Sequence, residues 1–171
     1  MRKSFIWGVA LGILVLVSDF LIKGYIDNEI PLIGVNGWAY PYNGIGVFKD
    51  FFGIEFSIVH AINKGAAWGT LSNFQIPLLV FRIVLIAGLC LYLIAFNTSR
   101  KYVIPLCLLT AGALGNVVDY FLYGYVIDMF KFVFWGYHYP IFNVADIAIT
   151  IGIVWLIIAS FVQYDTSTQT Q

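Results

Sequence analysis

The chain has 171 residues, of which 61% are hydrophobic and only 11% are charged. Soluble domains are on average roughly half apolar and about a quarter charged, so this composition argues against a water-soluble globule. Lys and Arg together number 9, as do Asp and Glu. The zero net charge excludes a nucleic-acid-binding module that neutralises phosphates, and the high hydrophobicity excludes a disordered chain.

Four apolar stretches are each long enough to cross a bilayer, which takes about 20 predominantly apolar residues. They are residues 5–26, 75–96, 102–123 and 141–162. The first follows Arg2 and Lys3 as a signal peptide would, but its apolar run is too long and no small-x-small cleavage site follows, so we expect a retained anchor. No compositional boundary divides the chain. We therefore predict one membrane-embedded domain over residues 1–171, an all-α membrane protein with a small β element.

The distribution of basic residues predicts the orientation of the four spans. Arg2 and Lys3 precede the first span, and Arg100 and Lys101 lie in the short turn between the second and third. Short basic segments stay on the cytoplasmic side of a membrane. We therefore expect both termini in the cytoplasm and the two longer segments, 27–74 and 124–140, outside.

The outer segments are rich in aromatic residues. Residues 47–60 mix β-branched and aromatic residues with polar ones between glycines, which predicts two short strands. An aromatic belt at the lipid headgroups explains most of the rings, and a cradle for an apolar or lipidated ligand is the alternative. The rings concerned are Phe51, Phe52, Phe56, Trp68 and Phe74 in the first segment and Phe130, Phe132, Phe134 and Trp135 in the second.

Charged and amide side chains inside the spans indicate a functional site, because they are costly in lipid. Asp19 and Lys23, four residues apart, can pair on one helix face, although such a pair can also serve only to specify the fold. The other spans carry Arg82, Asn116, Asp119, Asn143 and Asp146.

The depth of these residues is similar in all four spans. At about 1.5 Å per residue, Asp19 and Arg82 lie roughly 10 Å below the outer helix ends, and Asp119 and Asp146 lie about 6–8 Å below them. Asp146 is thus expected about two turns inside the last helix, on the same face as Asn143. The i,i+3 spacing also places Asn116 and Asp119 on one face. With Asn63 and Asp128 in the outer segments, these groups are predicted to converge on one pocket at the outer face.

Several carboxylates in one pocket indicate acid–base chemistry. Burial of Asp119, Asp128 and Asp146 together is costly through desolvation and repulsion and favours a shared proton. Two carboxylates that share a proton can activate water and polarise a peptide carbonyl, as in aspartic peptidases. No Ser or Cys stands beside a His in the outer zone, and His60 and His138 lack clustered partners for a metal. By elimination, an acid–base pair of carboxylates is the predicted chemistry, and its place at the outer ends of the spans suits a membrane-embedded peptidase.

Two other classes of protein remain open at this point. A small four-span transporter could use intramembrane carboxylates for proton coupling, but transporter sites tend to lie near the bilayer midplane, and the inner halves of these spans carry no charge. A non-catalytic assembly factor would keep its function when either Asp is replaced.

Five short blocks follow one another between about residues 15 and 150. They are Asp19-x-x-x-Lys23, Asn63-Lys64-Gly65-Ala66-Ala67-Trp68-Gly69, Gly112-Ala113-Leu114-Gly115-Asn116-Val117-Val118-Asp119, Val126-Ile127-Asp128-Met129-Phe130 and Phe142-Asn143-Val144-Ala145-Asp146. In this order they resemble the signature blocks of the lipoprotein signal peptidase (signal peptidase II) family, whose four-span plan and orientation agree with those predicted here.

The resemblance implies a bacterial aspartic peptidase of the cytoplasmic membrane that removes signal peptides from prolipoproteins and cuts just before the diacylglyceryl-modified cysteine. It implies Asp128 and Asp146 as the catalytic pair, no cofactor, and lipidated prolipoproteins and membrane lipids as partners. The family's extracytoplasmic β-cradle corresponds to part of 27–74. We expect a monomer.

The resemblance also implies a set of supporting residues. Asn63, Asn116, Asp119 and Asn143 match family positions that line or support the site, and the Asp19–Lys23 pair also matches. The family usually has Arg directly after the position of Asp119, where this chain has Tyr120. Lys23 and Arg82, which lie at similar depth, are the cations predicted to compensate.

Overall fold

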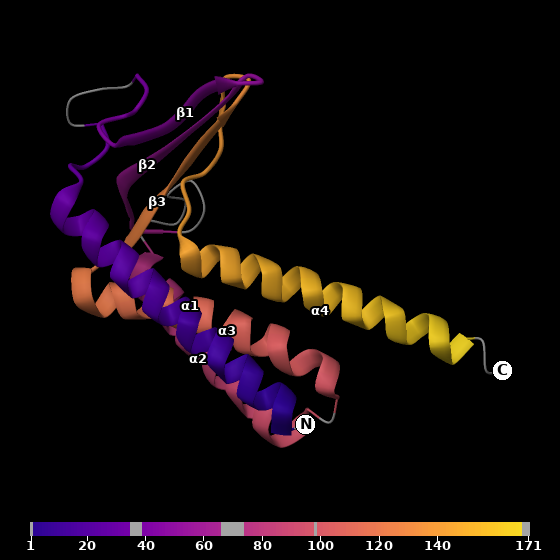
Figure 1. The fold of residues 1–171 in the computed structure, drawn as a ribbon. Helices are drawn as coiled ribbons and strands as arrows, with labels where there is room; N and C mark the ends of the chain where they lie inside the picture. Colours follow the sequence, from indigo (N-terminus) through magenta and orange to yellow (C-terminus); the bar gives the residue numbers. More distant parts are fainter. Residues whose placement is uncertain (1, 35–38, 66–73, 98, 169–171) are drawn as a thin grey trace.

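Four long α-helices and a small antiparallel sheet make up the part of the chain that the computed structural model describes, residues 2–34, 39–65, 74–97 and 99–168 (Figure 1). The helices are α1 (Arg2–Glu29), α2 (Gln75–Leu91), α3 (Arg100–Tyr123) and α4 (Val144–Thr168), and a π-helical turn, η3 (Tyr92–Phe96), continues α2. The strands are β1 (Ile45–Phe51), β2 (Ile54–Asn63), β3 (Val126–Phe134) and β4 (Tyr137–His138).

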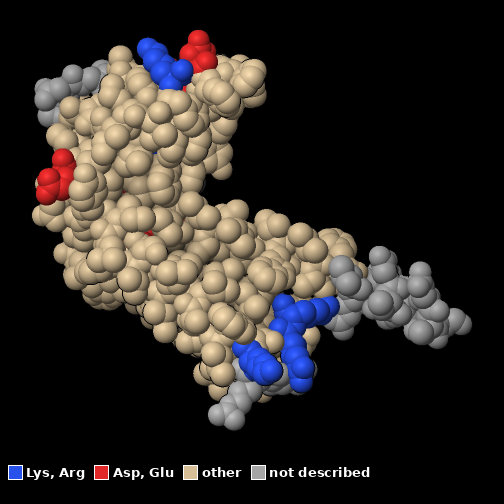
Figure 2. All heavy atoms as spheres, in the orientation of Figure 1, with Lys and Arg blue, Asp and Glu red and all other residues tan. Residues whose placement is uncertain are grey.

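The helices have the length and the surface of membrane spans. Four stretches qualify by length and hydropathy: Lys3–Glu29, Gln75–Phe96, Arg100–Tyr123 and Val144–Phe161. Apolar side chains such as Leu14, Phe81 and Ile158 are more than half exposed, as expected where lipid is the solvent. In Figure 2, most of the charged side chains lie toward the two ends of the molecule, and the surface along the helices between them is almost entirely uncharged. These observations confirm the predicted four-span fold with a small β element.

Helix α3 lies at the centre of the bundle and packs against α1, α2 and α4. In an 18-residue window of its spanning stretch, 67% of the residues are buried, against 6% in the corresponding window of Gln75–Phe96. A glycine permits the closest approach to α4, because a Cβ atom on Gly112 would lie 2.4 Å from the carbonyl oxygen of Ala145. This contact brings the polar residues in the second half of α3 next to the first turn of α4.

The sheet has the order β1-β2-β3-β4, and all neighbouring strands are antiparallel. Strands β1 and β2 confirm the two strands expected within 47–60. Strands β3 and β4 were not predicted, because the aromatic residues of 124–140 were interpreted as a lipid belt. In β3 these rings follow the period of two of a strand, and Phe132 stacks 4.3 Å from Phe56 of β2.

The sheet is attached where α1 and α3 end and α4 begins, an end of the bundle that we call the sheet end (Figure 1). It projects at a steep angle to α4, and the molecular surface is hollowed between the two (Figure 2). The register of β2 and β3 pairs Asn63 with Val126 and Ala61 with Asp128. Asn63 and Asp128, which are 65 positions apart, are thus brought together beside this hollow.

Candidate active site

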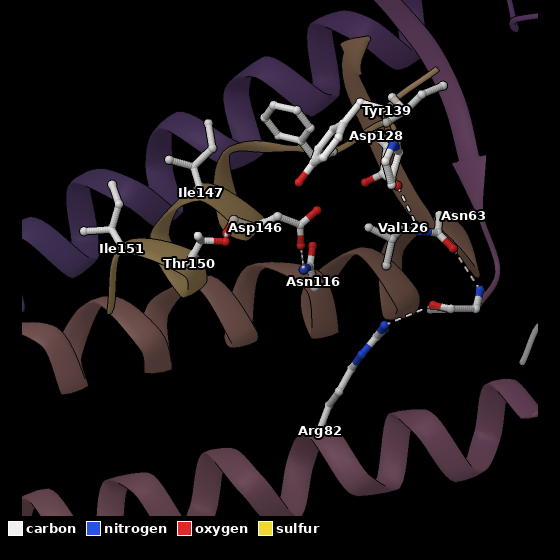
Figure 3. Close-up of a pocket in the computed structure, with 14 residues that line it drawn as sticks. Asn63, Arg82, Asn116, Val126, Asp128, Tyr139, Asp146, Ile147, Thr150 and Ile151 are labelled. Carbon is white, nitrogen blue, oxygen red and sulfur yellow. Dashed lines mark hydrogen bonds between the residues drawn. The ribbon is translucent and has the colours of Figure 1, made fainter. Parts of the chain in front are cut away.

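A cavity of about 470 Å³ lies at the sheet end, between the strands and helices α2, α3 and α4 (Figure 3). It is lined by both predicted catalytic residues, Asp128 and Asp146. The other lining residues are Asn63, Gly65, Arg82, Asn116, Val126, Tyr139, Pro140, Ile141, Phe142, Ile147, Thr150 and Ile151. The structure therefore brings together polar residues that the sequence distributes over two helices, two strands and the start of a third helix.

Asp128 enters the cavity from β3 and is only 3% exposed. Its Oδ1 accepts a hydrogen bond from Asn143 Nδ2 at 2.7 Å, and its Oδ2 accepts one from Asn63 Nδ2 at 2.9 Å. Burial, and then the carboxylate of Asp146, raise the pKa of Asp128 to about 7, although both amide hydrogen bonds act in the opposite direction. At neutral pH this carboxyl group can therefore either hold or release a proton.

Asp146 lies in the first turn of α4 and forms a capping box with Asn143. The backbone N–H of Asp146 donates to Asn143 Oδ1 at 2.8 Å, and the backbone N–H of Asn143 donates to Asp146 Oδ2 at 3.3 Å. The sequence-based prediction of two helical turns before Asp146 is wrong, because α4 begins at Val144. The i,i+3 spacing of Asn143 and Asp146 fits a capping box as well as a shared helix face.

Two buried asparagines connect the carboxylates of Asp128 and Asp146. Asn143 Nδ2 reaches Asp128, and it also donates to Asn116 Oδ1 at 3.0 Å. Asn116 Nδ2 in turn donates to Asp146 Oδ1 at 2.8 Å. Each amide holds a fixed orientation because both its oxygen and its nitrogen have partners, so the two carboxylates are held at defined positions.

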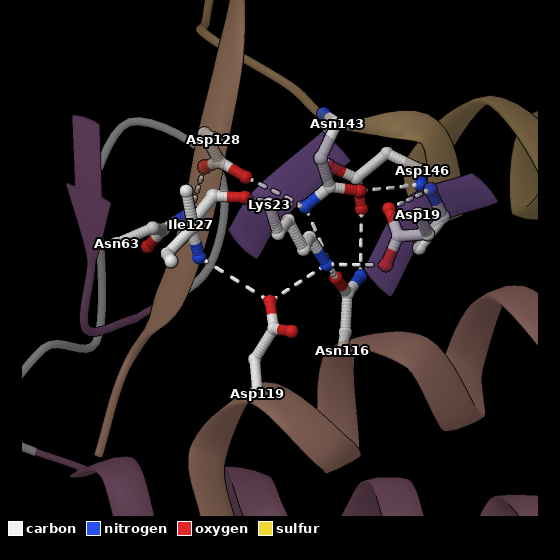
Figure 4. Close-up of polar contacts among 10 residues, drawn as sticks. Asp19, Lys23, Asn63, Asn116, Asp119, Ile127, Asp128, Asn143 and Asp146 are labelled. Atoms are coloured by element: carbon white, nitrogen blue, oxygen red, sulfur yellow. Dashed lines mark hydrogen bonds and ion pairs between the residues drawn. The ribbon is translucent and has the colours of Figure 1, made fainter. Parts of the chain in front are cut away.

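A buried ion cluster lies beneath these groups (Figure 4). Lys23 Nζ lies 2.6 Å from Asp19 Oδ2 and 2.6 Å from Asp119 Oδ2. It also donates to Asn116 Oδ1 at 3.3 Å. The predicted Asp19–Lys23 pair is thus present, and Asp119 shares the same ammonium group.

The cluster also holds backbone groups of two further elements. Asp19 Oδ1 accepts the backbone N–H of Ala145 at 2.9 Å, which caps the first turn of α4 from α1. Asp119 Oδ2 accepts the backbone N–H of Ile127 in β3 at 3.3 Å. Helices α1, α3 and α4 and strand β3 are therefore tied together directly under the cavity.

Arg82 points from α2 toward the end of β2, where its Nη2 donates to the carbonyl oxygen of Gly65 at 3.2 Å. Of the signature block that starts at Asn63, residues Ala66, Ala67, Trp68 and Gly69 lie outside the described residues. Tyr120 and Arg82 line a second, smaller hollow beside the same turn.

Sequence analysis missed the contribution of Tyr139 and Thr150, which line the cavity. Thr150 follows Asp146 by four residues, about one helical turn, and this spacing is the signal in the sequence that could have placed it on the same face. The histidines lie elsewhere: His60 Nδ1 is 3.0 Å from the carbonyl oxygen of Ile30, and His138 Nδ1 is 3.2 Å from Lys131 Nζ. Within the described residues, no three His, Cys, Asp or Glu side chains form a potential metal-binding group.

Comparison with known proteins identifies the family. A family model described as signal peptidase (SPase) II matches residues 11–162. A lipoprotein signal peptidase from Streptococcus pneumoniae is 35% identical over 153 residues, 88% of this chain and 90% of the relative. One from Clostridium acetobutylicum is 34% identical over 152 residues, 88% of each chain. One from Chlamydia trachomatis is 39% identical over 120 residues, 68% of this chain and 72% of the relative.

Solved structures agree with the sequence comparison. A bacterial membrane enzyme solved at 2.3 Å by the in meso method superposes with a TM-score of 0.73 at 30% identity, covering 94% of this chain and 90% of that one. A second such structure, solved at 1.9 Å, gives a TM-score of 0.69 at 29% identity, covering 89% and 90%. The chain therefore belongs to the signal peptidase II family and is a multi-pass membrane protease of the bacterial inner membrane.

Proposed function

We propose that the protein is an aspartic endopeptidase that removes signal peptides from diacylglyceryl-modified prolipoproteins and cuts just before the lipidated cysteine. The observation that carries the proposal is that Asp128 and Asp146 line one cavity and are linked through the side chains of Asn143 and Asn116. The carboxylates come from a strand and a helix that are joined by a short segment, so both can face one water molecule and one peptide bond.

The charge balance of the site supports a shared proton on this pair. Lys23 contacts Asp19 and Asp119 directly, so its single positive charge is already shared between those two carboxylates. Asp128 and Asp146 bond instead to neutral amides, which do not offset two negative charges. One proton between them relieves the repulsion, and the pKa of about 7 for Asp128 is consistent with a site that retains a proton near neutral pH.

The reaction then follows the chemistry of paired carboxylates. The ionised carboxylate removes a proton from water as the water oxygen attacks the scissile carbonyl carbon. The protonated carboxyl group donates its proton to the carbonyl oxygen. When the tetrahedral intermediate collapses, the C–N bond breaks, the carboxylic acid formed in the first step protonates the leaving amine, and the other carboxylate takes back a proton from a hydroxyl group of the intermediate, which restores the starting state of the pair. Asn63, Asn116 and Asn143 keep both carboxyl groups in place throughout.

The surroundings of the cavity fit a substrate that is partly lipid. Ile147 and Ile151 continue the cavity wall along α4, away from the carboxylates. A diacylglyceryl group on the residue after the cleaved bond can lie against this apolar wall while the peptide bond remains at the polar end. The basic residues Arg100 and Lys101 lie at the opposite end of α3, so the positive-inside rule orients the cavity outward and both termini toward the cytoplasm. The protein is proposed to act as a monomer.

The test is cleavage of a lipidated precursor by the purified protein in detergent, where no proton gradient exists. Asp128→Asn, Asp146→Asn and the double variant are each expected to lose at least about 1,000-fold in kcat, and the losses are expected not to add, because the two carboxylates act as a unit. Glu29→Gln, which removes an exposed carboxylate at the end of α1, serves as the matched control.

A folded single variant with near-wild-type cleavage would remove that residue from the pair, and Asp119 would be the next candidate. Absence of cleavage by the folded protein in detergent, together with solute uptake driven by a proton gradient in vesicles, would favour the transporter class. Equal cleavage of lipidated and unlipidated precursors would contradict the substrate assignment while leaving the peptidase chemistry intact.

A further inference from the structure

Arg82 is a cation on a membrane-spanning helix whose role the catalytic mechanism above does not require. Helix α2 directs most of its side chains outward, and Leu79 is its one buried residue among those described. A guanidinium group that faced lipid would be costly. Arg82 is half-buried and points instead toward the turn that ends β2, with its charge on the wall of the cavity (Figure 3).

Three hydrogen bonds lead in sequence from Arg82 to Asp128, and Figure 3 draws all of them. Arg82 Nη2 donates to the carbonyl oxygen of Gly65 at 3.2 Å. The backbone N–H of Gly65 donates to Asn63 Oδ1 at 3.0 Å, and Asn63 Nδ2 donates to Asp128 Oδ2 at 2.9 Å. This series of hydrogen bonds thus connects α2 to a carboxylate on β3 through Asn63 and Gly65.

The direction of the Asn63 amide depends on the turn. A carboxamide can present either its oxygen or its nitrogen to a neighbour. With Oδ1 held by the backbone N–H of Gly65, only Nδ2 is left to face Asp128, where it acts as a donor to the carboxylate. Gly65 is buried, and Arg82 holds the carbonyl oxygen of the same residue whose N–H holds Asn63, so the bond from Arg82 limits the movement of Gly65 on the other side of its Cα atom.

We propose that Arg82 is a positioning residue that acts through Gly65 and Asn63 to hold and orient the carboxylate of Asp128. The proposal rests on the peptidase function assigned above and adds a residue on α2 to the set that controls it. Arginine suits this task because its guanidinium group stays charged and forms strong hydrogen bonds with a carbonyl oxygen. One of its five N–H groups makes this bond, so the charge remains beside the cavity as well.

The first test is Arg82→Gln, measured as cleavage of a lipidated precursor across a range of pH. Because the carboxylate of Asp128 is then held less firmly, kcat is expected to fall about 10- to 100-fold, while KM changes less than about twofold. Donation from Asn63 favours the ionised form of Asp128, so its weakening should move both limbs of the pH profile to higher pH. Asp146 and Lys23, which also act on Asp128, are unchanged in this variant. Arg100→Gln, an exposed arginine at the far end of α3, is the matched control and should behave as wild type.

The second test asks whether the effect passes through Asn63. If it does, adding Arg82→Gln to an Asn63→Ala background should lower kcat by less than about twofold further. Losses that multiply would mean that Arg82 acts on the substrate directly and would overturn the proposal. Tyr120→Arg, on α3 beside the same turn, should restore part of the activity of Arg82→Gln by supplying a guanidinium group from the opposite side.

A variant that fails to fold and a failure of the proposed peptidase function each give results different from a failure of the Arg82 proposal. If Arg82→Gln does not fold in detergent, Arg82→Lys replaces it, and a folded Arg82→Lys enzyme with lower kcat but unmoved pH limbs overturns the proposal. If Asp128→Asn cleaves normally, the assigned function fails. If Asp128→Asn is inactive and Arg82→Gln retains full kcat, only the role of Arg82 fails.

Discussion

Replacement of Asp128 by Asn is expected to stabilise the protein at alkaline pH and to leave its stability unchanged at acid pH. The pKa of Asp128 is about 7 in the folded protein and 3.8 in an exposed chain, so the fold disfavours the ionised form. Below about pH 4 the carboxyl group is protonated in both states and carries no penalty. Between about pH 4 and 7 the unfolded chain binds fewer protons than the folded one, and stability falls as pH rises. Above about pH 7 the penalty is constant.

The size of the effect follows from two terms. The pKa values of about 7 and 3.8 differ by about 3 pH units, and at about 1.4 kcal/mol per unit the penalty above pH 7 is about 4 kcal/mol. Both oxygens of Asp128 accept hydrogen bonds from amide nitrogens. An asparagine can accept only one of them, which costs about 1–2 kcal/mol. The net gain at pH 9 is about 2–3 kcal/mol, or about 5–10 °C in melting temperature for a chain of this size.

The assay is thermal melting in detergent at pH 4, 6 and 9, followed by tryptophan fluorescence. The protonated wild-type residue also places one O–H toward an amide donor, so wild type and variant should melt together at pH 4. Glu29→Gln is the control, and we expect it to change the melting temperature little at any pH. A stabilisation by Asp128→Asn that is equal at pH 4 and 9, or that is missing at pH 9, would refute the reasoning.

Three further predictions test the surrounding structure. Lys23→Met leaves two buried carboxylates without their cation and should cost about 3–5 kcal/mol, seen as a lower melting temperature in detergent; an unchanged value would mean that the ion cluster contributes nothing to stability. Asn143→Ala removes the bond to Asp128 and half of the cap of α4 and should lower kcat by at least about tenfold, whereas wild-type kinetics would contradict the bridging role. With the native cysteines replaced by alanine, Lys49→Cys should react with an impermeant thiol reagent added to intact cells and Arg100→Cys should not; the reverse pattern would invert the orientation of the site.

The spans and most of the site could be predicted because lipid makes polar groups conspicuous. Asp19, Lys23 and Asp119 each interrupt an apolar helix, and a charge in hydrocarbon needs a partner. The helices alternate in direction, yet their charges lie at similar depth, so their convergence followed from helix geometry alone. The structure confirms four helices of membrane-spanning length at about the predicted positions, except for the start of α4, and adds that Lys23 contacts two carboxylates at once.

The start of α4 could not be placed from the sequence. Residues 141 and 142 are apolar and read as a continuation of the span, but the chain there still follows the sheet, and Phe142 pairs with Phe130 of β3. Asn143 and Asp146 have the same spacing in a capping box as on a helix face. The capping box and the helix face are distinguished by Asp19, 126 residues earlier in the chain, which accepts a hydrogen bond from the backbone N–H of Ala145.

The sheet was predicted only in part for a related reason. Aromatic residues suit both a lipid headgroup belt and a strand, and composition cannot separate the two. The alternation of Phe130, Phe132 and Phe134 is a strand pattern, but its meaning depends on pairing with β2, a segment about 70 residues earlier. Pairing between segments so far apart in the chain gives no recognisable pattern in the sequence of either segment.

Because the cavity is built from segments far apart in the chain, it is complete only after the last of these segments has been synthesised. The ribosome releases the N-terminal residues first, so α1 enters the membrane with Asp19 and Lys23 already able to neutralise each other. Asp128 follows after α3, but its partner Asp146 and the amide of Asn143 arrive only with the last helix. On the proposed mechanism, a chain still leaving the translocon has no complete catalytic pair, and it acquires one only when α4 packs against Gly112 of α3. Synthesis itself acts as the safeguard that other proteases obtain from a removable pro-segment.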